Sequence, residues 1–328
     1  MPRYRNSPRK VILAKPRGFC AGVERAIDVV NLALELYQPP VYVRKQIVHN
    51  RYVIETLSKK GAVFVDEVDE VPEGALVIVS AHGVSPDVFE KAQQRRLNVI
   101  DATCPLVMKV HAEVKRFARQ GLSIILIGHE GHDEVIGTMG EMPGRIHLVS
   151  TVEQAERVRV PDSEKVAVTT QTTLSVDDAR AILEVLKRRF PGLVTPSSDD
   201  ICYATQNRQA AVKLIAQEAD LVLVVGSDNS SNSERLREVA EASGARSYLI
   251  DNVSEIQDEW LDGVDIVGIT AGASAPEKLV LDVVDFFREM GVEKFEDFEA
   301  MTEQVAFALP SISFQEFAKT AGHSVTPR

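Results

Sequence analysis

Three cysteines, the only ones in a chain of 328 residues, lie far apart in the sequence. Cys20, Cys104 and Cys202 each lie in a short polar loop just before a strongly helical stretch. No pair has the close spacing of a zinc ribbon or a Cys-x-x-Cys redox motif, so only the fold can bring the thiols together. The repeated context predicts one shared site with three thiolates. Three buried small hydrophobic side chains are the alternative interpretation.

The cysteine count is odd, and the N-terminus lacks an apolar signal core. Both features argue against a disulfide framework, and this bears on the compartment. No apolar run approaches the roughly 20 residues that a membrane span needs. With 45% hydrophobic and 26% charged residues and a net charge of −11, the chain does not have the basic balance of a nonspecific nucleic-acid binder. We therefore expect a cytoplasmic protein that binds no membrane and no nucleic acid.

Short apolar runs alternate with segments of helical period along most of the chain. This alternation predicts an α/β fold with largely parallel sheets. Strands are expected at 11–14, 41–43, 62–65, 76–79, 124–127, 166–169, 221–225, 247–250 and 266–269. Apolar residues from Val23 to Tyr37 follow the i, i+3, i+4, i+7 rule, which predicts a helix directly after Cys20.

The same alternation divides the chain into three units of similar length, each close to the size of a compact domain. We expect α/β domains at 21–103, 104–201 and 202–291, with a cysteine close to each boundary. Residues 1–20 are expected to form an N-terminal extension with the first strand and the first cysteine. In residues 292–328 several phenylalanines are scattered without helical or strand period, which predicts a wrapping C-terminal tail.

Polar loops follow five of the expected strands, at the edge where open α/β sheets bind ligands. They are 81–83, 128–134, 170–173, 226–233 and 270–276. Their hydroxyls, amides and imidazoles, next to helix N-termini, suit a phosphorylated ligand. Helix capping is the alternative for any single loop, such as the one that contains Ser230. Neither a Walker-type phosphate loop nor a Gly-x-Gly-x-x-Gly motif after a strand is present, so the phosphate is expected on the substrate.

Nine short motifs occur in unbroken order over roughly residues 11 to 290. They are PRGFCAGV (16–23), VHNR (48–51), SAHG (80–83), DATCPLV (101–107), GHEGHDE (128–134), QTTLS (171–175), ICYAT (201–205), SSNS (230–233) and TAGASAP (270–276). On these motifs the chain closely resembles the 4-hydroxy-3-methylbut-2-enyl diphosphate reductases. That family performs the last step of the methylerythritol phosphate route to isoprenoids.

The resemblance implies three similar α/β domains in a pseudo-threefold arrangement around one four-iron, four-sulfur (4Fe-4S) cluster. The implied ligands are Cys20, Cys104 and Cys202, which leave one iron open for the substrate hydroxyl. The residues implied to bind the substrate are His49, His82, His132, Thr172, Ser230, Ser231, Asn232 and Ser274. Glu134 is the implied catalytic proton donor.

The resemblance also implies the reaction, a reductive dehydroxylation of the allylic diphosphate to isopentenyl and dimethylallyl diphosphate with loss of water. Two electrons would pass through the cluster from a ferredoxin or flavodoxin, since no flavin or nicotinamide motif is visible. For Glu134, a closed pocket beside a diphosphate would raise the pKa and a helix N-terminus would lower it, and both stay open. Two other classes remain alternatives, an iron-sulfur sensor that binds a phosphorylated metabolite and a metal-free binding protein whose cysteines only pack.

Overall fold

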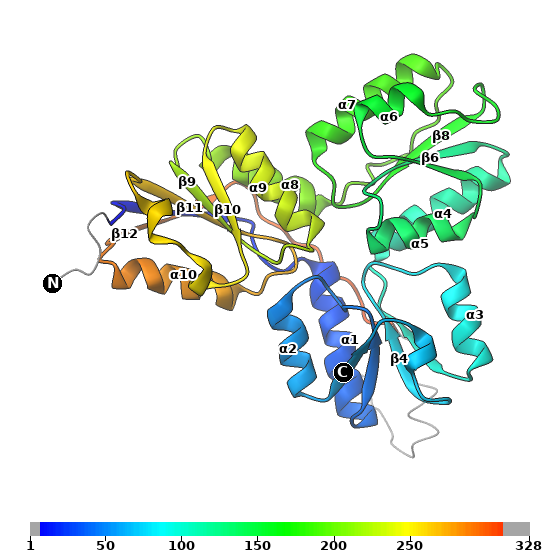
Figure 1. Cartoon of the computed structure of the whole chain (residues 1–328), viewed down its shortest axis with the longest axis horizontal. Coiled ribbons are helices and arrows are strands. Elements are labelled where there is room, and N and C mark those ends of the chain that lie inside the picture. Colours follow the sequence, from blue (N-terminus) through cyan, green and yellow to red (C-terminus); the bar gives the residue numbers. More distant parts are fainter. Residues whose placement is uncertain (1–6, 311–328) are drawn as a thin grey trace.

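The protein consists of three α/β lobes around a common centre (Figure 1). The computed structural model describes residues 7–310, so expectations for 1–6 and 311–328 lie outside the described residues. Each lobe contains one sheet, and every pairing within the three sheets is parallel. The predicted fold class, three small α/β units with parallel sheets, is confirmed.

The first lobe is built on a four-stranded sheet in the order β3-β2-β4-β5. Its elements are α1 (Ala21–Tyr37), β2 (Val41–Arg44), α2 (Arg51–Lys59), β3 (Ala62–Val65), η1 (Val68–Glu70), β4 (Leu76–Val79), α3 (Pro86–Gln94) and β5 (Asn98–Asp101). Helix α1 packs on one face of this sheet through an apolar stripe that includes Ala26, Val29 and Val30, and α3 covers the other face. All of these elements fall within the predicted range 21–103.

The second lobe has a three-stranded sheet in the order β7-β6-β8. Its elements are α4 (Pro105–Arg119), β6 (Ser123–Ile127), α5 (Asp133–Glu141), β7 (Ile146–Val149), α6 (Val152–Arg157), β8 (Val166–Thr170) and α7 (Val176–Arg189). Helices α4 and α7 bury their apolar sides against opposite faces of this sheet, with Phe117 and Leu186 among the most buried side chains. These elements fall within the predicted range 104–201.

The third lobe has a five-stranded sheet in the order β10-β9-β11-β1-β12. Its elements are β1 (Lys10–Lys15), α8 (Tyr203–Ile215), β9 (Leu221–Val225), α9 (Ser231–Ala242), β10 (Arg246–Ile250), η2 (Val253–Glu255), η3 (Asp258–Leu261), β11 (Ile266–Ala271), α10 (Glu277–Glu289) and β12 (Lys294–Glu299). Strand β1 therefore joins the last lobe although it begins the chain. Strand β12 lies inside the range 292–328, where we expected a tail without a strand, and it pairs with β1.

The parallel strands bring the polar loops to the centre, because the carboxyl ends of parallel strands share one edge of a sheet. Loops that follow β4, β8, β9 and β11 all contribute residues to one cavity between the lobes. Within residues 7–310, no helix has both the length and the apolar character needed to cross a membrane. The domain boundaries stay a prediction.

Packing on helix α10 allows a direct test of the third lobe's core. Phe287 is fully buried between the helix and the sheet, whereas Leu281 on the same helix is 49% exposed. Phe287→Ala should lower the free energy of unfolding by about 3–5 kcal/mol, the usual cost of emptying a buried phenylalanine site. Leu281→Ala is the matched control and should change it far less. Equal losses in urea denaturation would contradict this description of the core.

Candidate functional site

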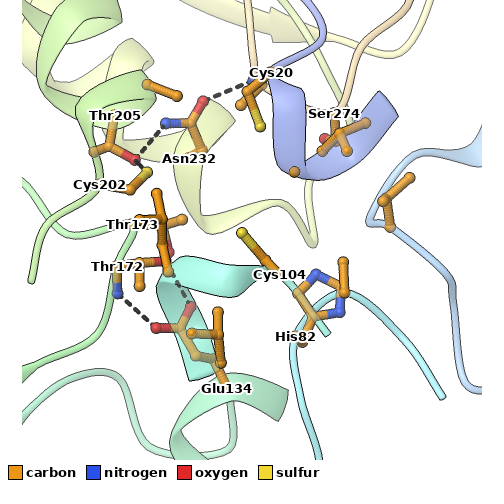
Figure 2. A pocket seen from close by; sticks show the side chains of 18 of the residues that line it. Cys20, His82, Cys104, Glu134, Thr172, Thr173, Cys202, Thr205, Asn232 and Ser274 are labelled. Carbon is orange, nitrogen blue, oxygen red and sulfur yellow. Dashed lines mark hydrogen bonds between the residues drawn. The ribbon is translucent and has the colours of Figure 1, made fainter. Parts of the chain in front are cut away.

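One cavity between the three lobes is lined by every residue that the sequence analysis selected as catalytic, substrate-binding or metal-ligating. These residues are Cys20, His49, His82, Cys104, His132, Glu134, Thr172, Cys202, Ser230, Ser231, Asn232 and Ser274. They come from all three lobes, so the cavity exists only when the lobes are packed together. Figure 2 shows the side chains of Cys20, Cys104 and Cys202 entering this space from three different segments.

Each cysteine occupies the same local position, the N-cap of a helix: Cys20 for α1, Cys104 for α4 and Cys202 for α8. The backbone N–H of each cysteine donates to a carbonyl in a loop that follows a strand. The acceptors are Ala273 for Cys20, Ala81 for Cys104 and Thr172 for Cys202, at 3.2, 2.9 and 3.0 Å. The threefold similarity of the lobes is thus repeated at the cysteines themselves.

The environment of the thiols fits a bound metal group with thiolate ligands. Burial raises the pKa of Cys104 to about 12 and that of Cys202 to about 11, and it also raises the pKa of Cys20. Backbone N–H groups in the first helical turn lower these pKa values in part, so each sulfur already faces donors that favour the thiolate. Positive charge from a metal group is what would deprotonate three thiols with raised pKa values together.

Gly22 leaves room beside the sulfurs. A Cβ atom at this position would lie 2.7 Å from the Sγ of Cys104 and 3.9 Å from the Sγ of Cys20. Any larger residue would therefore occupy space between two of the thiols. The donor set and this space both fit an iron-sulfur cluster with three cysteine ligands.

Glu134, at the start of α5, is buried and bonded to Thr172, which follows β8. The backbone N–H of Thr172 donates to Oε1 at 2.6 Å and its hydroxyl donates to Oε2 at 2.9 Å. Burial raises the pKa of Glu134 to about 7 despite these two bonds, which lower it. In the ligand-free protein, burial is thus the largest influence on this pKa, and the two bonds from Thr172 offset it only in part. A carboxyl group with this pKa holds a proton for part of the time at neutral pH.

Three histidines form a compact group on one side of the cavity. The rings of His49 and His82 stack with centroids 3.9 Å apart, and His132 meets them edge-on at 5.5 and 6.0 Å. Burial lowers the pKa of all three, to about 4 for His132, so the rings are neutral in the ligand-free protein at neutral pH. The buried Nδ1 of His82 has no hydrogen-bond partner among the described residues. An anion beside these rings would raise their pKa values and accept hydrogen bonds from their N–H groups.

Lys45 and Asp133 add a charged pair next to the histidines. The Lys45 ammonium bonds to Asp133 Oδ1 between the first and second lobes. His49, His82 and Asp133 offer ligand atoms within 4.8 Å of one another, an arrangement that could hold a metal ion. Because Lys45 already neutralises the carboxylate, the group as it stands fits an anion better than a cation.

The hydroxyl and amide side chains of the cavity lie at the N-terminus of α9 and in the loop that follows β11. Ser230 caps this helix, and its hydroxyl lies 3.4 Å from that of Ser274. Asn232 accepts from the N–H of Ala273 and donates to Thr205, which contacts the sulfur of Cys202. Ser274 donates to the carbonyl of His49 at 2.8 Å, so it would have to exchange that bond to donate to a phosphate.

Several cavity residues were not selected from the sequence, among them Thr173, Thr205 and Phe307. Thr173 and Thr205 lie inside motifs quoted above, one and three positions from the selected residues Thr172 and Cys202, so proximity to a motif was the available indication. Phe307 belongs to the segment after β12, which reaches back to the cavity. Only its long-range packing places it there.

The sequence of the chain matches one protein family and several named relatives. Residues 11–288 match the family described as LytB protein. The 4-hydroxy-3-methylbut-2-enyl diphosphate reductase of Acidothermus cellulolyticus is 63% identical over 303 residues, which cover 92% of this chain and 89% of that protein. The reductase of the same name from Bordetella bronchiseptica is 58% identical over 311 residues, 95% of each chain.

Among solved structures, the E-1-hydroxy-2-methyl-but-2-enyl-4-diphosphate reductase from Plasmodium falciparum is similar at a TM-score of 0.91 and 38% identity, over 96% of this chain and 99% of that one. Fold and cavity together define a three-lobed α/β protein with three thiols in one central cavity. Within that class, the sequence match is decisive: the chain belongs to the LytB family.

The raised pKa of Glu134 can be measured in the metal-free protein by carbon NMR of labelled glutamate. We expect this carboxyl to titrate near pH 7 instead of its ordinary 4.5. Thr172→Val removes a hydrogen bond that lowers the pKa, so it should raise the value further, whereas Thr173→Val should leave it unchanged. Because the folded-state pKa is raised, the stability that Glu134 contributes is full below about 4.5 and is lost as the pH rises through about 7. Titration near 4.5 would contradict the burial argument.

Proposed function

We propose that the chain catalyses the reductive dehydroxylation of 4-hydroxy-3-methylbut-2-enyl diphosphate to isopentenyl diphosphate and dimethylallyl diphosphate, with loss of water. The LytB family match and the names of relatives up to 63% identical support this activity. The observation that carries the proposal is the meeting of three groups in one cavity. They are three thiols, a carboxyl group with a raised pKa, and a set of neutral hydrogen-bond donors suited to an anion.

We infer that Cys20, Cys104 and Cys202 hold one 4Fe-4S cluster with one iron left open. When bound, the cluster would pass on the two electrons that an external donor delivers and would offer a Lewis-acid position for the hydroxyl of the substrate. The three cysteines fix its place from three different lobes, and Gly22 keeps the space between two of them clear. The electron donor proposed is a ferredoxin or flavodoxin, and the compartment proposed is the cytoplasm.

The diphosphate end of the substrate is assigned to the histidine group and to the N-terminus of α9. His49, His82 and His132 are neutral when the site is free of anions, and a diphosphate would favour their protonated, hydrogen-donating forms. Ser230, Ser231, Asn232 and Ser274 contribute hydroxyl and amide donors, and the free N–H groups of the helix add to them. One N–H of the Asn232 amide is used by Thr205, which leaves the other for the ligand.

Proton delivery is assigned to Glu134 through Thr172. When Glu134 is protonated, its O–H can donate to the Thr172 hydroxyl 2.9 Å away, and the threonine proton is then free to point into the cavity. The pair can thus pass a proton from a closed side of the site to the reacting end of the substrate. The backbone N–H of Thr172 holds the other carboxyl oxygen and fixes the orientation.

The cofactor assignment is tested by replacing each cysteine singly with serine in anaerobically prepared protein. Each variant should lose most of its bound iron and its activity, because a serine hydroxyl is a poor replacement for a soft thiolate ligand. Ser175→Ala, which alters a helix cap away from the cavity, should keep both. A complete cluster with full activity in any cysteine variant would show that this cysteine is not a ligand and would remove the central assignment.

Glu134→Gln separates proton delivery from substrate binding. The amide keeps the size of the side chain but cannot transfer a proton, so kcat should fall by roughly 10²-fold or more while the substrate dissociation constant stays close to that of the parent protein. Glu130→Gln, an exposed change in the same loop, is the control. If kcat were unchanged and only KM rose, Glu134 would be a binding residue and the proton would have to come from elsewhere.

A further inference from the structure

Each lobe is flanked by two of the three cysteines, one where its first helix begins and one in the loop through which the chain passes to the next lobe. Cys20 caps α1 and Cys104 follows β5 in the first lobe, and Cys104 then caps α4 of the second. The third lobe begins at Cys202 and contains β1, which leads to Cys20. The spacing of the thiols therefore depends on how each entry helix is fixed relative to the exit loop of the same lobe.

In the first lobe this connection is made by Arg25, one turn after Cys20. Its Nη1 donates to the carbonyls of Ala102 and Thr103, the two residues before Cys104, at 3.1 and 3.0 Å. The arginine is only 7% exposed. Its Nε donates to the carbonyl of Ala308, so the same side chain also holds the segment that follows β12.

In the second lobe the equivalent side chain is Lys109, one turn after Cys104. Its Nζ donates to the carbonyls of Ser198 and Asp199 at 2.9 and 2.8 Å and to the carboxylate of Asp200 at 3.1 Å. Asp200 is itself held by the hydroxyl of Thr169 at the end of the sheet. Lys109 thus ties the start of α4 to the loop that precedes Cys202.

In the third lobe the equivalent side chain is Arg208, in the second turn after Cys202. Its Nε and Nη2 donate to the carbonyl of Gly18 at 3.1 and 2.8 Å, and Nη2 also lies 3.3 Å from the carbonyl of Phe19. These are the two residues before Cys20. Arg208 is completely buried, and its charge is balanced by Glu303.

We propose that Arg25, Lys109 and Arg208 are positioning residues that together fix the separation of the three thiols, each by tying the loop before one cysteine to the helix that begins at another. This inference rests on the proposed cluster site. Carbonyl groups of the three loops would otherwise lack strong partners, and a charged donor holds two adjacent carbonyls more firmly than a neutral one. The contacts form a closed cycle from Cys20 to Cys104, to Cys202 and back to Cys20, so every thiol is held both by its own helix and by the basic side chain of the preceding lobe.

Lys109 is the residue to test, because its side chain is 27% exposed, whereas Arg208 is buried and its loss endangers folding. The measurement is the rate at which an iron chelator removes the cluster from reconstituted protein, together with thermal unfolding of the metal-free form. Lys109→Gln should release the cluster roughly tenfold faster or more, the scale of a lost hydrogen bond to a charged group. Lys109→Arg, which keeps a charged donor, should restore most of the slow release.

Arg189→Gln is the matched control, since Arg189 also donates to two backbone carbonyls of the second lobe, those of Ala155 and Val158, but far from any cysteine. It should release the cluster at the parental rate. Lys109→Met combined with Asp200→Asn removes the carboxylate that the single change would leave without its partner, and it should lose the cluster as fast as Lys109→Gln. Should Lys109→Gln fail to fold, this double variant takes its place.

Parental release rates in either Lys109→Gln or the double variant would overturn the inference, as would equally fast release in Arg189→Gln. Faster release accompanied by an equal loss of thermal stability in the metal-free form would also overturn it, because the lysine would then act on the fold in general. A parent protein that takes up no iron at all would overturn the proposed function itself, and with it the reason to assign a positioning role to Arg25, Lys109 and Arg208.

Discussion

The meeting of three partly buried thiols in one cavity is the constraint on which the rest of the structure depends. Burial holds the pKa of Cys104 near 12 and that of Cys202 near 11, so the metal-free site is a set of neutral thiols. Metal charge shifts that balance, and the first-turn N–H groups of α1, α4 and α8 already face the sulfurs. Three lobes of similar construction, each with an entry helix capped by a cysteine, are one way to satisfy this condition with ligands far apart in sequence.

The same burial acts in opposite directions on the other titratable groups of the cavity. It raises the pKa of Glu134 to about 7 and lowers that of His132 to about 4, because in each case the charged form loses water. Glu134 can therefore keep a proton near neutral pH, while the histidines are uncharged as long as no anion is bound. One cavity thus contains both a proton donor, Glu134, and a group of histidines suited to a negative charge.

Much of this arrangement was predictable from the sequence, since β-branched runs, helical period and polar loops are local patterns. Each predicted strand is present, and all selected site residues line one cavity. Strands β5, β7 and β12 were missed. All three are edge strands with few fully buried residues, and β12 carries four charged side chains, so none of them shows a strong apolar run. Lys109, Arg25 and Arg208 were also missed as positioning residues. On a helix they look like ordinary surface charges, and their partners are backbone carbonyls, which have no signature in the sequence.

The most direct test of the central claim is the Mössbauer spectrum of protein reconstituted anaerobically with iron-57, recorded with and without the substrate. Three cysteines around one 4Fe-4S cluster predict a single iron whose parameters differ from those of the others and change when the substrate is added. An iron site that stays the same with substrate, or protein that holds no cluster while its three thiols remain free, would contradict the account.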